Sequence, residues 1–112
     1  MSGMDKLQLV AEPRRREILR IVWDRPHSVG EITERLDVSM GAVSQHLAKL
    51  RDAGMVTVEP SGRHRLYRAD RDALSELAPM LESMWAADLD RLATEAERRQ
   101  RSTHPTKGRS AQ

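Results

Sequence analysis

Residues 28–54 of this 112-residue chain read SVGEITERLDVSMGAVSQHLAKLRDAG. Ser28 and Glu31 have the spacing of a capping box, in which the serine hydroxyl accepts from the Glu31 amide and the carboxylate reaches back to the Ser28 amide. A helix should therefore begin after Ser28, with an apolar face formed by Val29, Ile32 and Leu36. Residues 37–39 supply a turn and a second N-cap, and Gly54 is a C-terminal stop for a helix of about residues 40–53. The stretch predicts two helices joined by a short turn.

The two faces of the helix predicted for residues 40–53 differ in chemistry. On a helical wheel one face is apolar, with Val43, Leu47 and Leu50. The opposite face is small and polar, with Gly41, Ser44, Gln45, Ala48, Lys49 and Asp52. Small residues let a helix approach a surface closely, and the side chains of Ser44 and Gln45 can hydrogen bond to base edges in a major groove. An ordinary solvated face is the alternative, although such a face would more usually carry pairs of Glu and Lys.

After Gly54 the helical period gives way to loose alternation, which is typical of strands. Residues 55–59 and 65–69 alternate on either side of turn-forming residues at 60–64, so a β-hairpin is expected. Its tip and return strand are basic, with Arg63, His64, Arg65 and Arg68. A basic hairpin beside two such helices suits contact with phosphates or with a minor groove. Charges that protect edge strands from aggregation would explain Arg65 and Arg68, but they explain the basic tip less well.

The N-terminal part of the chain predicts two further helices. Residues 7–10 suggest a short helix that ends before Pro13, and Pro13 suits the first turn of the next one. Apolar residues then recur at Ile18, Leu19, Val22 and Trp23. Residues 14–16 are three arginines in the first turn, where cations oppose the helix dipole. We expect them to form a solvated face with Glu12 and Glu17 as partners.

The last predicted element spans about residues 71–98 and carries a long apolar stripe. The stripe comprises Leu74, Leu77, Leu81, Met84, Trp85, Leu89, Leu92 and Ala96. Pro79 interrupts it, and we expect a new helix that has this proline in its first turn. The stripe is longer than a domain of this size needs for its own core, so part of it should be buried in a two-fold dimer. Residues 1–98 are thus expected to form one domain, followed by a basic, disordered tail at 99–112.

Composition limits what else the chain can do. It has no cysteine, so thiolate metal sites and disulfides are excluded, and three aromatic residues are too few for a platform that stacks successive bases. Residues 1–97 carry 14 Lys or Arg against 17 Asp or Glu, so the net charge of +2 comes from the tail. Without an apolar span or a signal segment we expect a cytoplasmic protein with no membrane partner. Ser44 and His46 do not face each other on a helix, and no constellation for catalysis can be identified, so we predict that the chain is not an enzyme.

The residues from about Leu9 to Ala69 resemble the winged helix-turn-helix of the ArsR family of bacterial repressors. The resemblance is carried by Val43–Leu47 (VSQHL), by the Leu50–Gly54 helix ending and by Leu66-Tyr67-Arg68 in the wing. It implies a mainly α-helical fold with a small β-hairpin, and a homodimer in which the first and last helices form the interface. In such a dimer the helix of about residues 40–53 would enter the major groove of a pseudo-palindromic, double-stranded operator, with residues of about 56–69 as the wing.

The resemblance also assigns residues to surfaces. By motif position it places DNA contacts at Ser39, Gly41, Ser44, Gln45, His46 and Arg63, to which the outer helix face and the hairpin add Lys49, His64 and Arg65. The interface would include Leu7, Val10, Leu81, Met84, Trp85, Leu89 and Leu92. For His46 three interpretations stay open, in this order: a boundary histidine bonded to backbone, a phosphate contact, or a base reader.

The chain departs from the metal-sensing members of that family. Those members use cysteines near the third helix, or an Asp and His set on the last helix, whereas this last helix has Asp88 and Asp90 but no histidine. The chain is therefore more similar to the metal-independent branch, and we expect no metal and no cofactor. Because residues 1–97 carry a net charge of −3, a winged-helix module that binds another protein is the alternative to a DNA-binding repressor.

Overall fold

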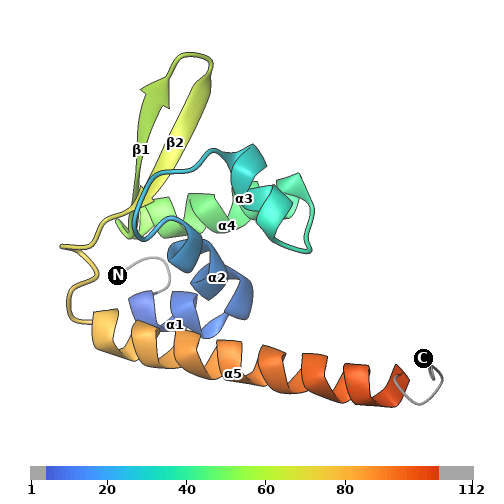
Figure 1. The fold of residues 1–112 in the computed structure, drawn as a ribbon. Coiled ribbons are helices and arrows are strands. Elements are labelled where there is room, and N and C mark those ends of the chain that lie inside the picture. Colours follow the sequence, from blue (N-terminus) through green and yellow to red (C-terminus); the bar gives the residue numbers. More distant parts are fainter. Residues whose placement is uncertain (1–4, 104–112) are drawn as a thin grey trace. The chain divides into compact units, whose positions relative to one another are not determined.

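The computed structural model describes residues 5–103 and is mainly helical with one two-stranded hairpin (Figure 1). In chain order the elements are α1 (Lys6–Ala11), α2 (Pro13–Ile21), α3 (Val29–Arg35), α4 (Met40–Asp52), β1 (Val56–Ser61), β2 (His64–Ala69) and α5 (Ala78–Thr103). The chain divides into two compact units, one that runs through Leu81 and one that begins at Glu82. The predicted fold class, helices with a small hairpin, is confirmed.

The short helices begin at the caps that the sequence predicts. The Ser28 hydroxyl accepts from the Glu31 amide at 3.2 Å, and the Glu31 carboxylate accepts from the Ser28 amide at 2.9 Å. This second hydrogen bond, which favours the charged form, is the main reason why the pKa of Glu31 is lowered. Ser39 caps α4 by accepting from the Ala42 amide at 3.1 Å. Both α3 and α4 therefore begin at a serine that satisfies one of the free amides of the first turn.

The end of α4 is a Schellman motif. Gly54 has a φ of 77°, which favours glycine because a side chain in this region is strained. Its amide donates to the Arg51 carbonyl, and the Met55 amide donates to the Leu50 carbonyl, both at 2.9 Å. These two bonds satisfy carbonyls that the helix leaves without partners and turn the chain into β1.

The core of the first unit is built from the apolar faces predicted for its helices. Ile32 on α3 and all three apolar residues predicted for α4 are buried. Val29 and Leu36, also predicted for the apolar face of α3, are half-buried. Other fully buried side chains come from α1, α2, the hairpin base and the segment after it: Leu9, Ile18, Leu19, Val22, Met55 and Leu74. The polar face of α4 consequently remains on the outside of this core.

Within the first unit, the hairpin projects from α3 and α4 with its turn farthest from them (Figure 1). Strands β1 and β2 are antiparallel, with Ser61 opposite His64, so the turn is only Gly62 and Arg63. Gly62 has a φ of 61°, which lets the chain reverse in two residues, whereas the sequence suggested a turn over residues 60–64. The base of β2 is anchored to the α2–α3 linker: His27 and Tyr67 exchange backbone hydrogen bonds of 2.9 and 2.8 Å.

Residues 71–77 form turns, and α5 begins at Ala78 with Pro79 in its first turn, as expected. The helix was expected to end near Arg98, but it continues through Thr103. The rest of the predicted tail, residues 104–112, lies outside the described residues. Among residues 5–103, no helix combines the length and the apolar character needed to cross a bilayer.

Candidate nucleic-acid interface

The outer face of α4 is exposed to solvent within the first unit. Gly41, Ser44, Gln45 and Lys49 are all exposed, and so is Ser39 at the N-cap. The Ser39 oxygen already accepts from Ala42, yet its hydroxyl proton stays available for a further acceptor. The face can therefore offer hydroxyl, amide and ammonium donors from a smooth helix surface.

One exposed residue of α4 was missed by the sequence analysis. Met40, the first residue of the helix, is 54% exposed. It lies one turn before Ser44 and adds an apolar group to an otherwise polar surface. The helical wheel gave no signal for it, because a methionine at the edge of the apolar face is usually part of the core.

The wing carries a second exposed group of donors. Arg63, in the two-residue turn, and His64 and Arg65, in β2, are exposed, and so is Arg68 farther along the strand. Within residues 5–103, none of the four forms an ion pair. Their hydrogen-bond donors are available to an anionic ligand.

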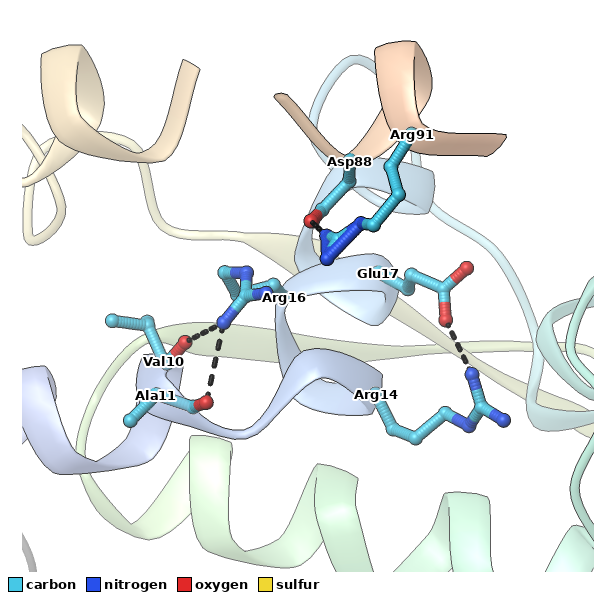
Figure 2. Close-up of polar contacts among 7 residues, drawn as sticks. All are labelled: Val10, Ala11, Arg14, Arg16, Glu17, Asp88 and Arg91. Atoms are coloured by element: carbon cyan, nitrogen blue, oxygen red, sulfur yellow. Dashed lines mark hydrogen bonds and ion pairs between the residues drawn. The ribbon is translucent and has the colours of Figure 1, made fainter. Parts of the chain in front are cut away.

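The arginines at the start of α2 do not form the solvated face that was expected. Arg15 and Arg16 are only 6% and 8% exposed. Arg16 Nη1 donates to the carbonyls of Val10 and Ala11 at 2.9 and 3.2 Å (Figure 2). These carbonyls belong to the last turn of α1, where they lack partners within the helix and where the dipole favours a cation.

Arg14 alone matches the expectation for this segment. It is half-buried and pairs with Glu17 at 3.1 Å (Figure 2). The Glu12 side chain accepts from the Arg14 amide and so caps α2. The sequence did carry a signal, the cost of three cations at a helix N-terminus, but this cost does not tell which acceptors compensate it.

His46 is half-buried and lies beside Arg15. Its Nδ1 is 3.4 Å from Nη1 of Arg15, and Nε of Arg15 donates to the Leu9 carbonyl at 2.8 Å. Burial is the main cause that lowers the pKa of His46. The interpretation ranked first, a boundary histidine bonded to backbone, is right about the half-buried position and wrong about the partner, which is the side chain of Arg15.

The residues predicted for the dimer interface have different degrees of exposure. Leu7 on α1, and Leu89 and Leu92 on α5, are between 52% and 57% exposed. Val10, Leu81 and Trp85 are buried, and Met84 is half-buried. The three exposed leucines are thus the members with apolar surface left to bury against a second chain. In the second unit, Asp88 and Arg91 form an ion pair one turn apart (Figure 2).

No cluster of metal ligands is formed by the described residues. Within the part of the chain that the structure describes, no three His, Cys, Asp or Glu side chains lie together as a metal site would require. Asp88 is half-buried and Asp90 is exposed on α5.

Comparisons with known proteins agree with this geometry. The sequence model of a family described as "Bacterial regulatory protein, arsR family" matches residues 12–58, from the α2 cap into β1. The chain is 38% identical over 82 residues to the HTH-type transcriptional regulator Rv2034 of Mycobacterium tuberculosis, covering 73% of this chain and 77% of that one. It is 33% identical over 79 residues to the transcriptional activator HlyU of Vibrio cholerae, covering 70% and 73%.

A solved structure shares the fold as well. A crystal structure described as "Possible transcriptional regulator for arsenical resistance" superposes with a TM-score of 0.63 at 36% identity. The match covers 82% of this chain and 96% of that one.

Proposed function

The chain belongs to the ArsR family of bacterial regulatory proteins, and we propose that it is a dimeric repressor that reads a pseudo-palindromic DNA operator. Its relatives are named as transcription regulators and not as enzymes. The observation that carries the proposal is the exposed outer face of α4, which is small enough to enter a major groove. In helix-turn-helix proteins the second helix lies in that groove with its N-terminal residues on base edges.

In this proposal α4 reads sequence and the wing binds backbone. Ser44 and Gln45 hydrogen bond to base edges, Gly41 permits close approach, and Ser39 and Lys49 bind phosphates. Arg63, His64 and Arg65 bind phosphates or enter the adjacent minor groove. His46 has only its Nε2–H left for DNA, because Nδ1 faces Arg15.

The proposed dimer uses the exposed leucines of the terminal helices. Leu7, Leu89 and Leu92 expose apolar surface that a second copy would cover. A two-fold dimer presents two α4 helices, so half-sites should be spaced about 10 bp apart or by a multiple of it.

Metal-independent regulation is a further part of the proposal. Its support is that the whole sequence lacks cysteine and that Asp88 and Asp90 have no histidine beside them on α5. Adding Zn²⁺, Ni²⁺ or a chelator should leave the affinity for the operator unchanged, as measured by fluorescence anisotropy. If a metal ion releases the protein from the operator, the chain belongs with the metal-sensing members of the family.

Two sets of substitutions test whether α4 reads the base sequence and the wing binds the DNA backbone. Ser44→Ala with Gln45→Ala should bring cognate affinity toward that for random duplex, since each lost base contact is worth about 1–3 kcal/mol. Arg63→Ala should weaken binding to cognate and random duplex alike. Arg71→Ala, an exposed arginine outside both surfaces, is the matched control. If both sets bind as the parent does, these surfaces are not the DNA interface.

A protein-interaction module is the second candidate, and the net charge of −3 over residues 1–97 favours it. The mass in solution and binding to duplex at low salt separate the two. A monomer that binds no duplex would favour the interaction module.

A further inference from the structure

Arg15 connects two helices that are distant in sequence. Its guanidinium donates to the Leu9 carbonyl in the last turn of α1 and lies 3.4 Å from Nδ1 of His46 in the middle of α4. The side chain is only 6% exposed, so the charge depends on these contacts for its stabilisation. One buried cation therefore links the C-terminal end of α1 to the helix proposed to read DNA.

The contact requires a neutral His46. A guanidinium has only donors, so Nδ1 of His46 must accept and the ring proton must be on Nε2. Protonation of Nδ1 would turn a donor toward Arg15 and break the contact. Burial lowers the pKa of His46 most; the cations Arg15 and Arg14 on α2 and Lys49 on α4 lower it further, and Glu12 at the α2 cap raises it.

We propose that the contact between Arg15 and His46 positions α4, so that sequence-specific reading of DNA requires both a neutral His46 and the anchored end of α1. This role rests on the proposed function. His46 directly follows Gln45, so a shift of α4 at His46 displaces the proposed base-reading side chain. The other end of Arg15 is held by the helix that carries Leu7, one of the exposed residues proposed for the dimer. Arg15 thereby couples the state of α1 to the DNA-reading face.

A positioning role and a direct phosphate contact by His46 predict opposite effects of acid. A phosphate-binding histidine gains a charge when protonated, which strengthens binding to every duplex. A positioning histidine loses its contact with Arg15 instead, so affinity for the cognate duplex falls relative to affinity for random duplex. The ratio of the two affinities, the specificity ratio, therefore separates the two roles.

The experiment measures the specificity ratio of the full chain, at constant salt, from about pH 8 down to about pH 5; because the pKa of His46 is lowered, its proton should bind in the acid part of this range. The cognate duplex is one selected from a random pool, and the random duplex has the same length. We expect the ratio of the wild type to fall roughly tenfold toward the acid end, as for the loss of one hydrogen bond to a charged group.

Three variants make the test specific. His46→Asn retains an acceptor near the place of Nδ1 and does not titrate, so its specificity ratio should no longer depend on pH. Arg15→Gln should show the low ratio at every pH. Arg14→Gln, which removes the neighbouring half-buried cation, is the matched control and should behave as the wild type.

Each outcome decides for or against the positioning role. A wild-type ratio that stays constant or rises on acidification overturns it, and so does His46→Asn with undiminished pH dependence. Should Arg15→Gln fail to fold, the pH series and the ring ¹⁵N shifts of His46 still decide, because an Nδ1–H tautomer at neutral pH contradicts the contact. If the wild type binds the cognate and the random duplex equally at about pH 8, the proposed function is refuted as well. If only the pH effect is absent, the positioning role fails and the proposed function stands.

Discussion

Two arginine-rich segments of this chain have similar composition and opposite surroundings. Residues 14–16 open α2, and there Arg15 and Arg16 are buried against the last turn of α1. Arg63 and Arg65 in the wing are exposed. The difference arises from packing: the end of α1 presents unpaired carbonyls to Arg15 and Arg16 inside the fold, whereas Arg63 and Arg65 lie on an exposed two-stranded hairpin, where water solvates both the side chains and the free backbone groups of the strand edges. Counting basic residues therefore does not locate a DNA-binding surface, because a free carbonyl can hold an arginine inside the protein.

Stability gives the largest expected contrast between the two segments. Arg16→Met keeps the bulk of the side chain but removes the donor to Val10 and Ala11, and should lower the free energy of unfolding by about 3 kcal/mol. Arg65→Met, in the exposed wing, should change it by less than about 0.5 kcal/mol. Urea denaturation measures both, and equal effects would mean that the two segments do not differ in role.

For the salt dependence of DNA binding, the wing arginine should matter and the arginine at the start of α2 should not. Arg63→Ala should reduce the slope of log affinity against log salt by about one, as for one lost phosphate contact. Arg14→Ala should leave the slope unchanged, because Arg14 lies outside the proposed DNA surface and pairs with Glu17. The comparison would fail if both variants lowered the slope equally.

In the region around Arg15, His46 should make the stability of the fold depend on pH. His46 has a lowered pKa in the folded protein, so the unfolded chain binds its proton first as the pH falls below the ordinary value of about 6.5. Stability should decrease with falling pH through that window, down to the lower folded pKa. His46→Asn should remove this part of the pH dependence. Denaturation curves at several pH values measure it, and equal slopes for the wild type and the variant would contradict the half-buried environment of His46.

The smallest effect on stability is expected from the ion pair of Arg14, the partly exposed member of residues 14–16. Arg14 and Glu17 form a partly exposed ion pair, of a kind that contributes about 0.5 kcal/mol or less. Glu17→Gln should therefore shift the free energy of unfolding by no more than about that amount in urea denaturation. A larger loss would show that all of residues 14–16 act as internal anchors.

What could be predicted from sequence depended on the distance between interacting residues. The Ser28–Glu31 box, the Ser39 cap and the Gly54 stop involve partners within a few residues, and all three are where the pattern indicated. Pro79 lies in the first turn of α5, as expected, for the same local reason. Local signals thus sufficed for these helix starts, for the end of α4 and for its outer face, whereas α5 continues past the end expected near Arg98.

The contacts of Arg15, Arg16 and His46 could not be predicted in the same way. Their partners lie on other helices, and how α1 approaches α2 and α4 depends on tertiary packing. The wing turn was also shorter than expected, since Gly62 lets the chain reverse in two residues. Arginines crowded at a helix N-terminus were a signal that an acceptor was needed, but not of where it was.

Selection of bound duplexes from a random pool by the 112-residue chain tests most directly whether α4 and the wing form a sequence-specific DNA interface. The expected result is an enriched inverted repeat whose half-sites are about 10 bp apart or a multiple of it, with enrichment lost in the Ser44→Ala, Gln45→Ala double variant. A pool that stays random for the wild type, or an inverted repeat enriched equally by the double variant, would contradict that assignment.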